Sequence, residues 1–334
     1  MLDHSTYPFV GEFHGTSGPV RTSFNDGKLD VEDELIKACD DVLGITKKPR
    51  DPWSGDHIGF FNTLGAVIRT GPNKGKRSYA ARGYIEANKE RPNLKVLCEA
   101  FVNKINLNGS KAVGANITVD GRQYDIPVKQ EVIVCGGAYN SPQILELSGI
   151  GDPEVLRAAG VQCLIENKAI GANFQDHSLT LLMQAVKPGV ITMDTLQQIP
   201  EAMQGAMKQY GETGTGPLSR IASMQGFFPY KKIASEEELK SVVQSIRDIK
   251  PTSDFHKQQL EQIIAHLESD TSANLQLVVV PATANVKTGA EHQSQLFPPP
   301  PPDEPAGLTF ALCLQYPVSR GYIHITSAGR PYAL

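Results

Sequence analysis

The hydrophobic pattern of the first 92 residues predicts two helices separated by loops. Between residues 29 and 44, apolar side chains recur at helical spacing, with acidic residues in the first turn and Gly44 at the end. This pattern predicts an amphipathic helix. Residues 77–91 predict a second helix, which ends before the next proline. Residues 1–28 and 49–75 are rich in residues that favour turns and are predicted to be loops.

A β pattern follows, from residue 93 to residue 135. Its Val- and Ile-rich runs are separated by Asn108-Gly109 and Asp120-Gly121, and these dipeptides are typical of tight hairpin turns. We therefore expect a three-stranded antiparallel meander. Its continuation, Val132 to Cys135, is apolar without alternation, which predicts a short strand covered on both faces.

That predicted strand leads into a glycine turn and a helix. Gly136 and Gly137 come first, and Ser141-Pro142 then predicts a helix start with serine as the cap. A second glycine turn and another helix follow, up to Gly160. Such segments bring the backbone close to a nucleotide. A tightly packed strand–turn–helix unit gives the same pattern, so the pattern alone leaves both interpretations open.

The second half of the chain mixes helical and strand-like segments. Helices are predicted over residues 194–210, 236–249 and 255–268, and strands over 221–230, 274–284, 307–317 and 320–327. Ser235 with Glu238 predicts a capping box for the second of these helices. An antiparallel sheet with helices beside it is the expected arrangement, so the predicted fold class is α/β (α+β).

Composition narrows the possible partners. A hydrophobic content of 40% and a charged content of 20% are ordinary for a globular protein, and a net charge of -4 argues against binding to nucleic acid. No apolar run reaches the ~18 residues of a membrane span. The first ten residues have neither the basic nor the apolar region of a signal peptide. No nucleic acid or membrane partner is therefore predicted, and the cellular compartment stays open.

The cysteines, three histidines and the single tryptophan lead to separate expectations. Five widely spaced cysteines without a C-x-x-C motif predict buried free thiols and no metal site. His14 and His57 are loop histidines that could face a substrate cleft. Trp53 is expected to pack, and His324 is expected at the surface of a strand.

One stretch resembles a known family. The segment GAYNSPQILELSGIG, from Gly137 to Gly151, resembles the second signature of the glucose-methanol-choline (GMC) family of flavoprotein oxidoreductases. Other stretches resemble the family in the same order, between Phe13 and Ser327: FHGTSGPV, KRSYAARGYI, RPNLKVL, IGANFQDH and PVSRGYIHITS. The chain is most similar to the fungal glucose-oxidase and aryl-alcohol-oxidase branch.

The resemblance implies a fold and an activity. It implies a partial FAD-binding, Rossmann-like domain with a β-meander, and a substrate domain with an antiparallel sheet and flanking helices. Residues 80–186 would form the first, residues 187–334 the second, and residues 1–79 a loop-rich segment and helix on the substrate side. The implied cofactor is FAD. The implied reaction oxidises the CH–OH group of a small alcohol or sugar by hydride transfer to the flavin, and no specific protein partner is indicated.

The resemblance also implies cofactor contacts. The main chain at Val102 would approach the adenine, and Gly136 and Gly137 would pass beside the cofactor. Asn173, Asp176 and His177 would lie along the flavin. The Asp176–His177 neighbours are either a proton-handling pair or a packed structural pair.

The sequence also departs from the family pattern. No G-x-G-x-x-G occurs in the 334 residues, and the family's first signature is missing. The resemblance places the catalytic histidine C-terminal to this chain. We therefore expect a partial chain, equivalent to the middle of a GMC protein. The alternative is an inactive remnant that does not bind FAD independently and acts as an interaction module.

Overall fold

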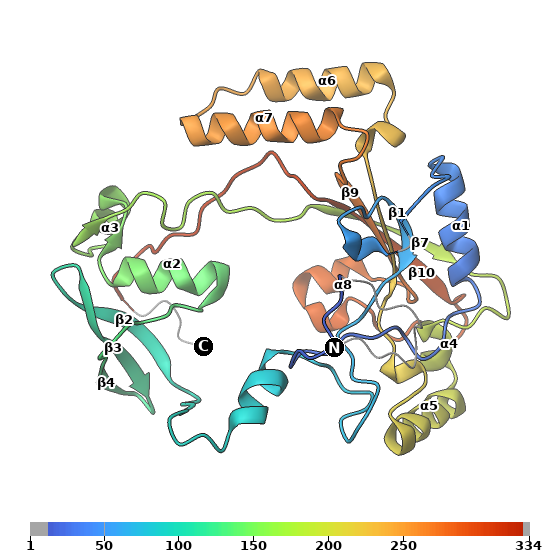
Figure 1. Cartoon of the computed structure of the whole chain (residues 1–334), viewed down its shortest axis with the longest axis horizontal. Helices are drawn as coiled ribbons and strands as arrows, with labels where there is room; N and C mark the ends of the chain where they lie inside the picture. The colour runs from blue at the N-terminus through green and yellow to red at the C-terminus, as the bar shows by residue number, and fades with distance from the viewer. Residues whose placement is uncertain (1–12, 50, 330–334) are drawn as a thin grey trace. The chain divides into compact units, whose positions relative to one another are not determined.

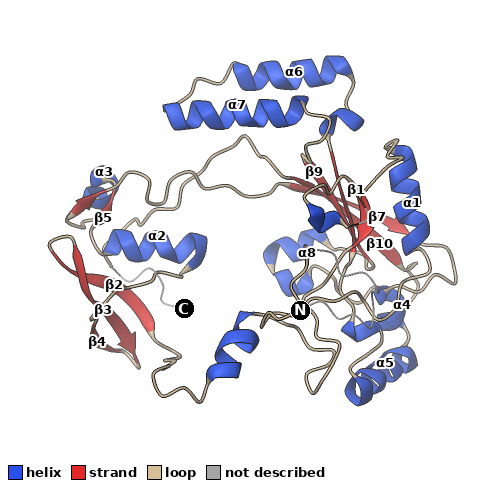
Figure 2. Cartoon of the chain, in the orientation of Figure 1, coloured by secondary structure: helices blue, strands red, loops and turns tan. Residues whose placement is uncertain are grey.

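The computed structural model describes residues 13–49 and 51–329. The chain divides into two compact units: unit 1 contains residues 1–90 and 177–318, and unit 2 contains residues 91–176 and 319–334. Figures 1 and 2 show the helices and strands of both units. The mixture of helices and antiparallel sheets confirms the predicted α/β (α+β) class.

Unit 1 is built on a five-stranded antiparallel sheet with strand order β1-β8-β9-β10-β7. Its strands are β1 (Gly59–Asn62), β7 (Leu179–Ala185), β8 (Met224–Phe228), β9 (Leu275–Val280) and β10 (Gly307–Leu314). The sequence predicted β8, β9 and β10. Strands β1 and β7 were not predicted, because their short segments lie in regions without a clear alternating pattern.

One face of this sheet forms the core of unit 1. Successive side chains of a strand point to opposite faces, and the buried set includes Phe60 of β1, Phe228 of β8 and Leu275 of β9. The predicted amphipathic helix is α1 (Glu32–Val42), and its Ile36 packs against this cluster. Figure 1 shows α1 beside the sheet. The helix thus covers part of this apolar face.

Unit 1 also contains further helices and short helical turns. They are α4 (Met193–Gln198), α5 (Pro200–Thr213), α6 (Glu236–Arg247), α7 (Asp254–Glu268) and α8 (Val286–Glu291), with short turns at η1 (Pro52–Ser54), η2 (Ala81–Ile85), η3 (Glu86–Asn88), η4 (Pro217–Ser219), η5 (Tyr230–Lys232) and η6 (Gln293–Gln295). The predicted helix over residues 77–91 is therefore only two short turns, η2 and η3.

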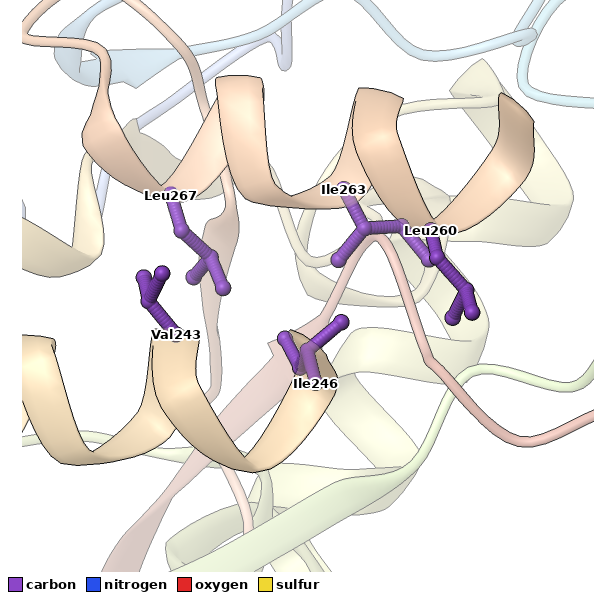
Figure 3. Packing of buried hydrophobic residues seen from close by; sticks show 5 residues of the cluster. All are labelled: Val243, Ile246, Leu260, Ile263 and Leu267. Carbon is purple, nitrogen blue, oxygen red and sulfur yellow. The ribbon is translucent and has the colours of Figure 1, made fainter. Parts of the chain in front are cut away.

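Helices α6 and α7 form a hairpin with its own small core. Figure 3 shows Val243 and Ile246 of α6 facing Leu260, Ile263 and Leu267 of α7. All five are at most 8% exposed. The Ser235 hydroxyl accepts the N–H of Glu238 at 3.1 Å and caps α6 as predicted. The Glu238 carboxylate does not complete the capping box, because it accepts the hydroxyl of Tyr230.

Unit 2 contains the predicted meander. Strands β2 (Phe101–Asn108), β3 (Lys111–Val119) and β4 (Arg122–Pro127) pair in antiparallel order. Gly109, Asp120 and Gly121 have positive φ angles of 60°, 48° and 75°, as tight hairpin turns require. The remaining elements are α2 (Gly137–Leu147), β5 (Ile150–Gly151), α3 (Pro153–Ala158) and β6 (Ile165–Glu166). Strands β5 and β6 pair in parallel.

Two predicted strands are wrong. Residues 132–135 and 322–327 belong to no strand, and Gly321 makes only an isolated bridge. A strand requires a neighbouring backbone, and none of the described segments pairs with residues 131–136. Instead of being covered on both faces, this segment alternates between half-buried and exposed residues, and Ile133 is 73% exposed.

The predicted start of α2 is also wrong. The helix begins at Gly137 and contains Pro142 inside it, so Ser141 is not the cap. Pro142 lies in the second turn of the helix and removes a single backbone hydrogen bond there.

The five cysteines are free, as predicted, but none is buried. Cys98 and Cys135 are exposed, and the other three are half-buried. Cys135 is exposed because its strand does not form. The predicted segment 80–186 also extends beyond residues 91–176 at both ends. The functional assignment of the three predicted segments remains a prediction.

Candidate functional site

Helix α2 of unit 2 begins at an exposed end without a side-chain cap. Gly136 occupies the N-cap position, and no side chain accepts a hydrogen bond from the first turn. Residues 137–140 are all exposed. The first N–H groups of a helix have no partner within the helix. They are therefore free to donate to acceptor atoms of a ligand.

The two glycines at this end have different structural roles. A Cβ atom on Gly136 would lie 3.0 Å from Asn140 and Ser141, so the helix's own first turn requires a glycine there. Gly137 has a φ of +73°, and a Cβ atom added to it would meet nothing within 4 Å. Gly137 therefore borders open space, where a ligand can approach the backbone.

The segment containing Asn173 lies beside this helix end. The rings of Tyr139, in the first turn of α2, and Phe174 are 5.8 Å apart. Phe174 exchanges two backbone hydrogen bonds with Gly321, at 2.9 and 2.8 Å. Asn173 itself has a φ of +58° and is exposed. The backbone of the segment is thus held in place, and the Asn173 side chain stays accessible.

The segment around Gly321 is in turn fixed to the far end of α2. The Glu146 carboxylate accepts hydrogen bonds from Nδ1 of His324 at 2.6 Å and from the N–H of Ile325 at 2.8 Å. Glu146 is fully buried. The prediction that His324 lies at the surface of a strand is therefore wrong, because its ring turns inward to this carboxylate. Helix α2, residues 171–174 and residues 321–325 support one another.

The structure brings together part of the predicted cofactor set. Gly136 and Gly137 lie at the end of α2 that contacts the Asn173 segment through the Tyr139 and Phe174 rings. Val102 lies on β2, is 37% exposed and pairs with Ile117. Strand β2 is joined to α2, because the N–H of Ile105 donates to the Ser148 hydroxyl at 2.7 Å.

Asp176 and His177 complete the predicted set but form no pair. Both are exposed, and neither has a hydrogen bond within the described part of the chain. The interpretation of these neighbours as a packed structural pair is therefore wrong. Asp176 ends the first stretch of unit 2, and His177 begins the second stretch of unit 1.

Unit 1 has a polar sheet face that the sequence did not predict. Gln315 donates to Gln276 at 2.9 Å, Gln276 donates to Gln225 at 2.7 Å, and Gln225 donates to the Thr63 hydroxyl at 2.6 Å. We call these three glutamines the amide chain. All three are half-buried, and each keeps a further amide N–H. His57 lies at the same face, with its ring 5.2 Å from that of Phe227.

A second feature of unit 1 is a cleft of about 430 Å³ next to β1. It is lined by His14, Trp53 and Lys48 among others. Nε2 of His14 lies 2.9 Å from Oδ2 of Asp51, and the His14 ring lies 5.6 Å from Trp53. His14 thus lines a cleft, and Trp53 packs against it. The His14–Asp51 pair has no signal in the sequence, because 37 positions separate the two residues.

Residues 17–179 match the family described as GMC oxidoreductase. A dehydrogenase of Monascus purpureus, mpl7, is 31% identical over 334 residues, which cover 96% of this chain and 53% of that protein. The chain belongs to the GMC oxidoreductase family. It spans about half the length of this GMC relative. The matched residues contain all six predicted cofactor contacts.

Solved structures show the same GMC fold. The FAD-dependent oxidoreductase from Chaetomium thermophilum superposes with a TM-score of 0.80 at 19% identity, over 96% of this chain and 53% of that one. A fungal aryl-alcohol oxidase superposes with a TM-score of 0.72 at 18% identity, over 96% and 52%. These likenesses show that the chain has the same fold as both proteins.

In the part of the chain that the structure describes, no helix is both long and apolar enough to cross a membrane. The same residues contain no group of three or more His, Cys, Asp or Glu side chains placed to hold a metal ion.

Proposed function

We propose that this chain supplies part of the FAD site and the substrate surface of an oxidoreductase. The reaction would oxidise the CH–OH group of a small alcohol or sugar. Bound FAD would supply the hydride acceptor. The observation that carries the proposal is the exposed, uncapped end of α2 with open space at Gly137, inside the segment that matches the family.

Unit 2 offers the hydrogen-bond donors and the accessible backbone that FAD binding requires. The free N–H groups at the start of α2 can donate to the cofactor's oxygen and nitrogen acceptors. The open space at Gly137 lets the cofactor approach the backbone. Asn173 presents an exposed amide beside this helix end. In this proposal Val102 contacts the adenine, and Asp176 and His177 lie along the flavin.

The amide chain of unit 1 supports the substrate part of the proposal. Its glutamines hold one another's orientation and retain spare donors on a half-buried face. Such amides can bind the hydroxyl groups of an alcohol or sugar. The proposed role of unit 1 is to hold and orient the substrate, and no described residue is assigned the role of proton acceptor.

The test uses matched glycine variants in a chimera. Residues 91–176 replace the corresponding segment of the Monascus purpureus dehydrogenase, and the flavin content per protein is measured from the visible spectrum. Gly137→Val should lower the flavin content, because the side chain enters the open space. Gly109→Val is the control, since Gly109 also has a positive φ (+60°) and free space around it. Equal flavin content in both variants would contradict the placement.

Two observations favour the alternative of a remnant that does not bind FAD by itself. The sequence contains no G-x-G-x-x-G, and residues 131–136 have no strand partner among the described residues. The turn and helix of that motif normally hold the pyrophosphate. We therefore expect the 334-residue chain, purified with added FAD, to be colourless and inactive in alcohol-dependent dye reduction. A stoichiometric yellow protein that oxidises an alcohol would exclude this alternative.

A further inference from the structure

Unit 1 contains a second cavity, of about 250 Å³, on the side where α1 and α4 begin. Most of its lining is apolar, including Leu29, Ile191, Leu196 and Phe297. Two charged residues, Glu32 and Arg220, also line it. It shares no residue with the predicted cofactor contacts, the amide chain or the His14 cleft.

The two charged groups in this cavity lie close to apolar lining residues. Nε of Arg220 is buried and has no hydrogen-bond partner among the described residues. Glu32 is only 8% exposed. Burial raises the pKa of Glu32. The hydrogen bond from the Leu29 backbone and the positive charge of Arg220 offset part of this rise, so the two charged groups interact electrostatically. No ion pair joins the two groups among the described residues, and both line the same cavity.

The wall that carries Arg220 is held rigidly. Asn25 accepts the N–H of Ile221 at 3.2 Å and donates to its carbonyl at 3.0 Å. The buried guanidinium of Arg69 donates to the Ser219 hydroxyl at 2.9 Å and to its carbonyl at 3.1 Å. These bonds fix the residues on either side of Arg220.

The opposite wall is equally fixed. Asp194 of α4 is 1% exposed. Its carboxylate accepts the N–H and hydroxyl of Thr283, at 3.0 and 2.7 Å, and the N–H of Gly307 at 2.9 Å. Helix α4 is thereby tied to the end of β9 and the start of β10. The cavity is therefore preformed, as small-molecule sites usually are.

We propose that this cavity binds a small uncharged molecule with an apolar body and one amide or hydroxyl group. The polar group would accept an N–H of the Arg220 guanidinium and donate to the Glu32 carboxylate, since both residues line the cavity. The apolar body would lie against Leu196 and Phe297. The size is suitable, because an apolar cavity of ~150 Å³ already holds a benzene molecule.

The charges select against ionic ligands. A carboxylate would pair with Arg220 but would be repelled by Glu32. An ammonium group would pair with Glu32 but would be repelled by Arg220. Charge buried without compensation is costly. A neutral group that both donates and accepts satisfies both residues, which is why the proposal specifies an amide or a hydroxyl.

The experiment titrates the 334-residue chain with benzamide and benzyl alcohol, followed by ligand-observed NMR. Benzoate, benzylamine and toluene are the comparison set, because they share the ring and differ in the head group. Benzamide and benzyl alcohol should bind at least about tenfold more tightly than the other three. Equal binding of toluene would mean a plain apolar void, tighter binding of benzoate would mean an anion site, and no binding would mean no site. Each of these three results overturns the proposal.

Two variants locate the site. Arg220→Met should weaken benzamide binding about tenfold, whereas the control Arg157→Met, at an exposed position in unit 2, should leave it unchanged. Ala222→Phe, at an exposed lining position, should block the cavity without altering the core. Unchanged binding in either cavity variant overturns the proposal. No flavin is needed, so the result is independent of the proposed oxidoreductase function.

Discussion

Glu146 and His324 are 178 positions apart and form a hydrogen bond of 2.6 Å in the interior of unit 2. Glu146 is completely buried, while the His324 side chain is 20% exposed. The carboxylate also accepts the N–H of Ile325. One side chain of α2 therefore fixes residues 321–325, which in turn hold the segment with the proposed cofactor residue Asn173.

Glu146→Leu should lower the free energy of unfolding of unit 2 by about 3 kcal/mol. It leaves the Ile325 N–H and the His324 ring without their buried acceptor. Urea unfolding measures the change. The control is Glu154→Leu, at an exposed position in α3, which should change stability by less than about 0.5 kcal/mol. Similar losses in both variants would show that Glu146 has no special role.

Gly171 should tolerate no side chain. Its φ is +71°, and a Cβ atom would lie 2.1 Å from the carbonyl oxygen of Ile323. Gly171→Ala should cost more than about 2 kcal/mol, because strain in the left-handed region adds to a backbone clash. It should also speed hydrogen exchange of the Ile323 N–H, which donates to Gly171.

The control for Gly171 is Gly160→Ala. Gly160 has a similar φ of +75° but nothing within 4 Å of its Cβ position. The Gly160→Ala variant should lose only the about 1–2 kcal/mol that a left-handed backbone conformation costs a residue with a Cβ atom. Hydrogen exchange of the Ile323 N–H should not change. An equal loss of stability in the two variants would show that the backbone of residues 321–325 moves away easily.

The residues of unit 2 show how far the sequence could predict the fold. Asn108-Gly109 and Asp120-Gly121 define hairpin turns through local backbone preferences, and the meander was predicted from them. Val132 to Cys135 have the composition of a strand, but a strand also requires a partner, which local composition does not encode.

The site was predictable only where a motif is continuous in the chain. The Gly137–Gly151 segment identified the family and the end of α2. The amide chain and the Glu146–His324 and His14–Asp51 pairs join residues far apart in the sequence, so only the fold reveals them. The start of α2 was misplaced because Ser141-Pro142 matches a helix start locally, whereas Gly136 and Gly137 allow the helix to begin earlier.

The amide chain should stabilise the polar face of the sheet. Gln276→Leu removes the acceptor of Gln315 and the donor to Gln225. Because the site is half-buried, we expect a loss of about 1 kcal/mol in the free energy of unfolding. The control is Gln184→Leu on the exposed side of β7. A loss no larger than in the control would mean that water replaces both hydrogen bonds at no cost.

Tyr230 should give unit 1 a pH-dependent stability in the alkaline range. Its hydroxyl donates to the Glu238 carboxylate at 2.6 Å, and this hydrogen bond raises the pKa of Tyr230 from 10.0 to about 12. A raised folded pKa means that the stabilisation is fully present below pH 10 and is lost as the pH rises toward 12.

Spectrophotometric titration of the phenolate band, comparing the chain with Tyr230→Phe, tests this directly. The difference between the two curves should contain one tyrosine that ionises near pH 12. Below pH 10 the variant should also be less stable in urea by a constant amount. A difference curve centred at pH 10 would show that the hydrogen bond to Glu238 does not persist in solution.

Glu32 should destabilise the folded chain when it is ionised. Burial raises its pKa above 4.5, and the hydrogen bond from the Leu29 backbone and the charge of Arg220 offset this only in part. For a carboxyl group with a raised folded pKa, the favourable contribution is present below the unfolded pKa and is lost as the pH rises through the folded pKa. Glu32→Gln should therefore raise the urea midpoint at pH 7, and the gain should shrink below about pH 4.

Glu34→Gln, in the same first turn of α1 but exposed, should instead lower the midpoint slightly, because it only removes a favourable interaction with the helix dipole. If Glu32→Gln lowers the midpoint at pH 7, the ionised carboxylate is held by Arg220 more strongly than burial penalises it.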